Sequence, residues 1–110
     1  MAKLFMLAGG IVEPGAGQPG RVSAFVAFNP KPTASRLFKV HGSATSPAVT
    51  ELPSATTVDL GAFRRELADE LGPAVEEIRA KGGAAAIAQP RAEWVLEVVK
   101  QHLRAGGVEV

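Results

Sequence analysis

Residues 60–78 of the chain read LGAFRRELADELGPAVEEI. At the rotation of about 100° per residue in an α-helix, the large apolar side chains of this stretch share an arc of about 120°. They are Leu60, Phe63, Leu67, Leu71, Val75 and Ile78. The same phase continues across Gly72 and Pro73, and two separate helices would have no reason to share it. The pattern predicts one amphipathic helix, kinked at Pro73, with Asp59 as N-cap and Gly82 as C-cap.

A second helix is expected from Pro90, in its first turn, to about Ala105, with Gly106 ending it. Its apolar stripe consists of Val95, Val98, Val99, His102 and Leu103. Trp94 and Leu96 widen this stripe on opposite flanks to more than half of the helix circumference. A helix this apolar is expected either to be deeply packed or to contact both a sheet and a partner.

The first half of the chain has the pattern of β-strands. Residues 3–12 and 21–28 are expected to form a hairpin, because Glu13–Gly20 is rich in proline and glycine. A third short strand is expected over residues 36–41, after the two prolines of Asn29–Pro32.

Residues 42–57 are rich in serine, threonine and proline and show no strong periodicity. A structureless loop of this length is unusual within a compact domain. The segment is therefore expected either to be an extended arm that lies on a partner, or to contain one short strand around Val49–Leu52.

Together these segments predict a single domain over residues 1–110. It comprises a strand-rich part (1–41), the Ser/Thr/Pro-rich arm or loop (42–57) and a helical half (58–110). Further short strands are expected at 84–88 and 108–110. The order, an N-terminal β-hairpin or meander joined to helix–strand–helix–strand, predicts an α+β fold with the helices packed on one face of a mixed sheet.

Composition excludes several kinds of site. The chain has no cysteine, so disulfides, thiolate metal sites and cysteine nucleophiles are excluded. No paired ligand spacing such as HExxH occurs, so neither a metal nor a cofactor is expected. No apolar run approaches the ~20 residues of a membrane helix. We therefore expect no membrane contact, and a location in the cytoplasm or in a virion assembled there.

The stretch from Gly15 to Val22 matches the dinucleotide-binding pattern GxGxxG. That motif requires a helix after its last glycine, whereas the residues from Arg21 onward are expected to form a strand. The glycines therefore indicate a hairpin tip, with phosphate binding helped by Arg21 as the alternative.

A small enzyme is one alternative function. His41 and His102 are the only histidines, and a catalytic histidine would need a carboxylate beside it in a pocket. His102 lies in an apolar stripe, where a hydrogen-bonded core imidazole is the simpler interpretation. His41 precedes Ser43 without the GxSxG turn of a serine nucleophile. No catalytic residue is assigned, and an enzyme is not favoured.

A nucleic-acid-binding protein is another alternative. Residues 1–50 carry five basic side chains and one acidic, whereas residues 51–110 carry seven basic and ten acidic. A basic sheet face would present Phe25, Phe28 and Phe38 for base stacking, with four candidates for binding a polyanion: Arg21, Lys31, Arg36 and Lys39. The net charge of only +1 argues against this function.

The function expected first is that of a non-enzymatic structural or assembly protein. Such a protein is a small subunit or accessory component of a larger complex, and a bacteriophage virion is one example. Its partner is expected to be a second copy, forming a homo-oligomer, or another protein subunit. The candidate contact residues are Trp94, Leu96, Arg64, Val49 and Leu52.

Overall fold

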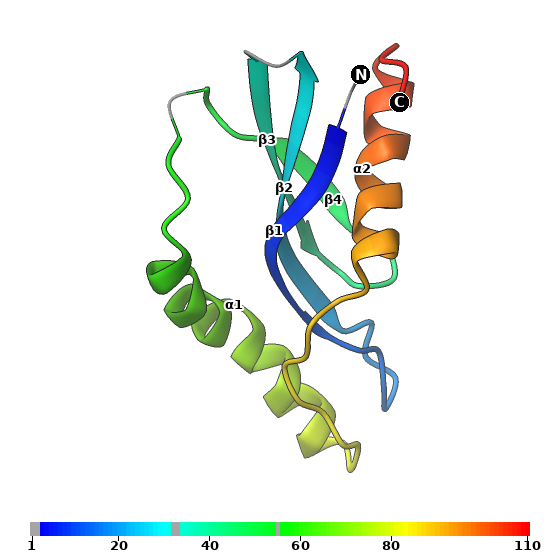
Figure 1. The fold of residues 1–110 in the computed structure, drawn as a ribbon. Coiled ribbons are helices and arrows are strands. Elements are labelled where there is room, and N and C mark those ends of the chain that lie inside the picture. The colour runs from blue at the N-terminus through cyan, green and yellow to red at the C-terminus, as the bar shows by residue number, and fades with distance from the viewer. Residues whose placement is uncertain (1–2, 32–33, 55) are drawn as a thin grey trace.

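A computed structural model describes residues 3–31, 34–54 and 56–110. Four strands, β1 (Lys3–Val12), β2 (Arg21–Lys31), β3 (Ala34–Gly42) and β4 (Ala48–Glu51), form an antiparallel sheet in chain order. Helices α1 (Leu60–Ala80) and α2 (Ala92–Ala105) follow (Figure 1). The expected α+β class is confirmed.

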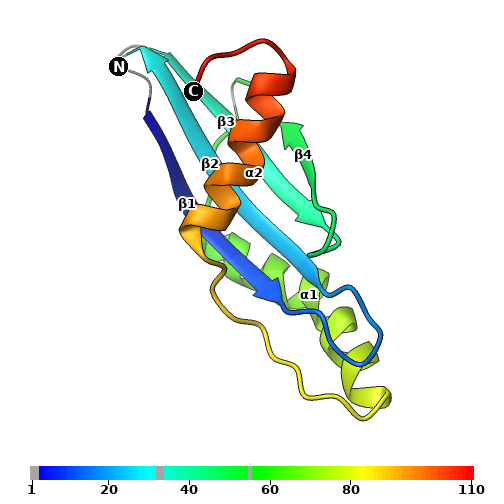
Figure 2. The same cartoon turned by 90° about the vertical axis from the view of Figure 1, so that its right-hand side faces the viewer.

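The two helices cover opposite faces of the sheet (Figures 1 and 2). Val26 and Phe28 of β2 belong to the core beneath α2, whereas Phe25 meets Phe63 of α1 edge-on, with 4.8 Å between ring centroids. The expectation that both helices cover one face of a mixed sheet is therefore wrong, and all pairings of the described strands are antiparallel. The physical reason is that β2 is buried on both faces, Ala27 and Ser23 included, so each face needs a cover.

Each helix contributes to its own core. Beneath α2, Val95, Val99 and Leu103 pack on residues of the first three strands. Beneath α1, the core consists of Val12, Leu71, Val75 and Ile78. Burying a side chain of this size contributes about 1.5–3 kcal/mol, so these two clusters fix both helices on the sheet.

Helix α1 is a single helix that contains Pro73, as its continuous phase predicts. The Asp59 carboxylate caps it by accepting the amides of Gly61 and Ala62 at 2.9 and 3.1 Å. The C-cap is Lys81, one residue before the expected Gly82. Leu60 is an exception to the buried stripe, since it is 52% exposed.

Helix α2 differs from expectation at two residues. It begins at Ala92 after the N-cap Arg91, so Pro90 precedes the helix and does not lie in its first turn. His102 is exposed and makes a T-shaped contact with the Phe38 ring, at 5.9 Å between centroids. The expected core histidine is wrong because the buried side of α2 is centred on Val99, which leaves His102 on the flank. Gly106 is the C-cap, as expected.

Residues 83–91, here called the strap, connect α1 to α2 past β1 (Figure 2). A strand over 84–88 is not observed, because only Ala88 pairs, in an isolated bridge with Ile11. Residues 108–110 form no strand either. The amide of Val108 instead donates to the Leu103 carbonyl at 2.9 Å, closing the end of α2.

The Ser/Thr/Pro-rich segment contains a strand, whereas residues 13–20 form the tip between β1 and β2. In the Ser/Thr/Pro-rich segment, β4 pairs with β3, and the Leu52 amide donates to the Leu37 carbonyl at 2.9 Å. Of the two alternatives for residues 42–57, the structure therefore shows the segment that contains one short strand. At the β1–β2 tip, Gly20 has φ +73°, and a Cβ there would collide with the Val12 carbonyl. Strand β2 follows this glycine directly, so the helix that the GxGxxG motif requires is missing.

Candidate functional site

The exposed large apolar side chains of the described residues lie on β1, at the start of α1 and in the strap. Phe5, Leu7, Leu60 and Ile87 are 41%, 38%, 52% and 40% exposed. All but Phe5 line one open cavity of about 420 Å³ between β1, α1 and the strap. We call this cavity the β1–α1 groove, and its main lining residues are Leu7, Ala8, Leu60, Phe63, Arg64 and Ile87. Contiguous exposed apolar side chains of this kind typically mark an interaction site.

The groove arises from an irregularity in β1. The register between β1 and β2 shifts between Met6 and Ala8, which leaves Leu7 as an extra residue. Small residues follow, and a Cβ at Gly10 would lie 3.0 Å from Leu67 of α1. Strand and helix therefore approach closely at Gly10, and the first turn of α1 projects Leu60 beyond this contact.

Arg64 is the charged residue that lines the groove. Its side chain is exposed, and it makes no ion pair or hydrogen bond with any residue that the structure describes. The helical phase places Arg64 within the apolar stripe of α1, and in the structure this part of the stripe borders the β1–α1 groove. An unpaired guanidinium beside apolar side chains can bind a carboxylate while its stem covers apolar surface.

The other candidate contact residues lie elsewhere. Trp94, Leu96 and Val49 are half-buried and pack against the core beneath α2. Leu52 is half-buried at the end of β4. Arg64 is thus the one candidate at the groove. The sequence indicated Leu60 as an apolar residue of the α1 stripe, whereas nothing in the sequence indicated that Leu7 is an extra residue in β1.

The outer edge of β1 is open beside the groove. β1 is an end strand of the sheet, and within the described residues its outward hydrogen bonds are those between Ile11 and Ala88. Continuing the strap antiparallel to β1 would bring Pro90 opposite Gly9, and a Cβ at Gly9 would indeed lie 3.1 Å from the Pro90 ring. Proline has no amide hydrogen to donate, so the strap cannot extend the pairing toward Lys3.

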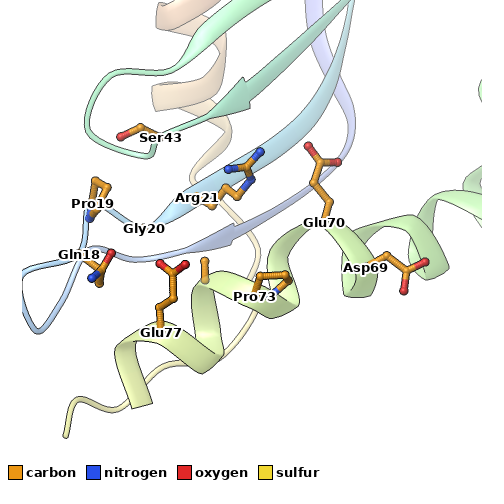
Figure 3. Close-up of a pocket in the computed structure, with 10 residues that line it drawn as sticks. Gln18, Pro19, Gly20, Arg21, Ser43, Asp69, Glu70, Pro73 and Glu77 are labelled. Atoms are coloured by element: carbon orange, nitrogen blue, oxygen red, sulfur yellow. The ribbon is translucent and has the colours of Figure 1, made fainter. Parts of the chain in front are cut away.

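A second hollow, of about 460 Å³, lies between the hairpin tip and α1 (Figure 3). Its polar lining residues include Gln18, Arg21, Asp69, Glu70 and Glu77. The lining therefore contains three carboxylates and one guanidinium, with Asp69 directed away from Arg21 (Figure 3), and this balance disfavours a phosphate group. The charges around the hairpin tip therefore disfavour the alternative interpretation of its glycines, phosphate binding helped by Arg21.

The four polyanion candidates do not form one basic face. Arg21 lines the hollow beside α1, and Lys39 on the same face contacts Glu70 at 3.3 Å. Arg36 lies on the α2 face, with its guanidinium 5.3 Å from the Phe38 ring centroid. The side chain of Lys31 lies outside the described part of the structure. Phe28 and Phe38 are 1% and 0% exposed, so neither can stack on a base.

Arg36 is also paired. It donates two hydrogen bonds to Glu51 of β4, at 2.8 and 2.7 Å. These bonds hold the pKa of the Glu51 carboxyl below its ordinary value and raise the pKa of the Arg36 guanidinium. This pair joins β3 to β4, and it leaves Arg36 less available for a phosphate.

Both histidines lie outside the lining of the groove and of the second hollow. His41 Nε2 lies 2.8 Å from Thr50 Oγ1, whereas the exposed His102 contacts the Phe38 ring. The described side chains include no group of three or more metal ligands suited to an ion. Among the residues that the structure describes, no helix has the length and apolar character needed to cross a bilayer.

Comparison with known proteins gives no family assignment. No protein-family model matches the chain, and neither curated proteins nor solved structures give a match.

Proposed function

We propose that this protein is a non-enzymatic assembly component that binds another protein through the β1–α1 groove. The observation that carries the proposal is the gathering of Leu7, Leu60 and Ile87 around one groove, each more than a third exposed. In this proposal the chain is a small subunit or accessory component of a larger particle, such as a bacteriophage virion, that assembles in the cytoplasm.

The energetics of association support a partner that covers more than the groove. Apolar burial contributes roughly 25 cal/mol per Å², but association costs an estimated 4–15 kcal/mol. A stable interface usually covers about 800 Å² on each partner. The groove supplies the apolar centre of such an interface, and Phe5 with the open edge of β1 extends it along the sheet.

The charges favour a protein partner over a nucleic acid. Arg36 is held by Glu51 and Lys39 by Glu70, so two of the polyanion candidates are partly neutralised. The apolar groove offers no comparable row of cations. A protein surface with apolar side chains matches it better than a phosphate backbone does.

Site-specific photo-crosslinking tests this function. A photoreactive amino acid replaces Ile87 in the chain expressed in its source cells, and a matched control places it at Ala80, an exposed position outside the groove lining. We expect one discrete crosslinked product from position 87 and none from position 80. Finding only uncrosslinked monomer at position 87, or the same products from both positions, would refute the proposal.

A further inference from the structure

From the open edge of β1, we infer that the groove binds an extended, acidic segment of a different protein, which adds a strand to the sheet. This inference rests on the proposed function and specifies its partner. The segment would pair with the outer edge of β1 and place its apolar side chains against Leu7, Leu60 and Ile87. Its carboxylates would bind Arg64 and Lys3.

The backbone geometry provides the pairing surface. Pairing alternates along an antiparallel ladder, so every second residue of an end strand directs its amide and carbonyl outward. Ile11 points outward to Ala88, and the unbroken register of β2 opposite Leu4 and Met6 directs these two residues outward as well. Their outward groups are unpaired within the described structure, and Pro90 keeps the strap from covering them. An edge of this kind accepts an added strand.

The two cations beside the groove favour an acidic partner. Lys3 is the only charged residue in β1, and Arg64 is the only one lining the groove. Neither forms an ion pair among the described residues. A second copy of the chain would bring two Lys3 and two Arg64 side chains to one interface with no carboxylate in β1 or the groove lining to offset them. An acidic segment would neutralise both cations, so a different protein fits this edge better than a second copy.

Selection from a random peptide library tests the charge requirement. The full chain is the target, and a displayed library of random 12-residue peptides is the probe. We expect the wild-type chain to enrich peptides rich in acidic and β-branched residues. R64E should remove the acidic enrichment, whereas R65E should keep it, because Arg65 is exposed but does not line the groove. Equal loss in both variants, or enrichment of basic peptides by the wild type, would overturn the inference.

Amide hydrogen exchange tests the added strand. A selected peptide should slow exchange of the Leu4 and Met6 amides at least tenfold, and N-methylation at alternate peptide residues should abolish this protection. Binding without protection would overturn strand addition. The photo-crosslink from position 87 tests the proposed function independently of the peptide selection. If position 87 crosslinks to a different protein but the selection shows no acidic enrichment, the acidic segment is refuted and the proposed function stands. If position 87 crosslinks to a second copy of the chain, and light scattering gives the mass of a dimer, the inference of an acidic partner is overturned and the groove is a self-association surface.

Discussion

Ile11 and Ala88 exchange two backbone hydrogen bonds of 2.9 Å, and this pair ties the strap to the edge of β1. It joins residues far apart in the chain, and it brings Ile87 to the groove. The contact therefore connects the fold to the proposed binding surface.

Substituting Ala88 by proline removes one of these two donors. We expect A88P to lower the unfolding free energy by about 1–3 kcal/mol, because the Ile11 carbonyl loses its partner, and to speed amide exchange at Ile11. The control is A86P, at an exposed position for which no hydrogen bond is observed. Equal destabilisation in a urea titration would show that the bridge does not hold the strap.

The hairpin tip gives a matched pair of glycine substitutions. Gly17 and Gly20 both have positive φ, +78° and +73°, but only at Gly20 would a Cβ meet the backbone. G17A should cost about 1–2 kcal/mol, the price of a left-handed residue with a side chain. G20A should cost clearly more, measured as the shift in unfolding free energy. Equal losses would contradict the close approach of Gly20 to Val12.

The Arg36–Glu51 pair predicts a pH dependence of stability. The pKa of Glu51 is lowered in the folded state, so the pair stabilises the protein above the ordinary pKa of a glutamate and loses this effect as pH falls through the folded-state value. Because both side chains are more than a third exposed, the effect is at most about 1 kcal/mol. E51Q should therefore destabilise the protein at pH 7 and progressively less in acid. The matched control is E109Q, at an exposed glutamate without an ion pair among the described residues; equal pH dependence of the two variants' unfolding free energies would contradict the role of the Arg36–Glu51 pair.

Helix α1 carries both a buried residue that the fold needs and an exposed residue that is available for binding. Phe63 is 4% exposed, whereas Leu60 is 52% exposed. F63A should cost about 3–5 kcal/mol through the cavity it leaves, and L60S should change the unfolding free energy by about 0.5 kcal/mol or less. A large loss in L60S would mean that Leu60 supports the fold, and would weaken its assignment to a binding surface.

Several elements could be predicted because their signals are local. The unbroken helical phase across Pro73 predicted a single α1, and the glycines and prolines before Arg21 predicted a hairpin. The side on which each helix packs could not be predicted, since β2 has apolar residues on both faces. A run of alanines suggested a strand in the strap, but alanines offer little area to bury, and Pro90 limits the pairing.

The groove was harder to predict than the fold. Its apolar residues come from β1, the first turn of α1 and the strap, which only the tertiary structure brings together. The extra residue at Leu7 depends on the register against β2 and has no sequence signal. The width of the apolar stripe on α2 instead drew attention to Trp94 and Leu96, which the structure places against the core beneath α2.

The size of the chain's native complex tests the central claim most directly. The chain and its double variant L60E/I87E are expressed at native level in the source cells, and gently prepared extracts are separated by size. We predict that the wild type elutes in a larger complex and the variant as an 11.4 kDa monomer, although both purified proteins unfold at closely similar urea concentrations. Elution of the wild type as a monomer, or of both chains in the same complex, would contradict the proposed binding surface.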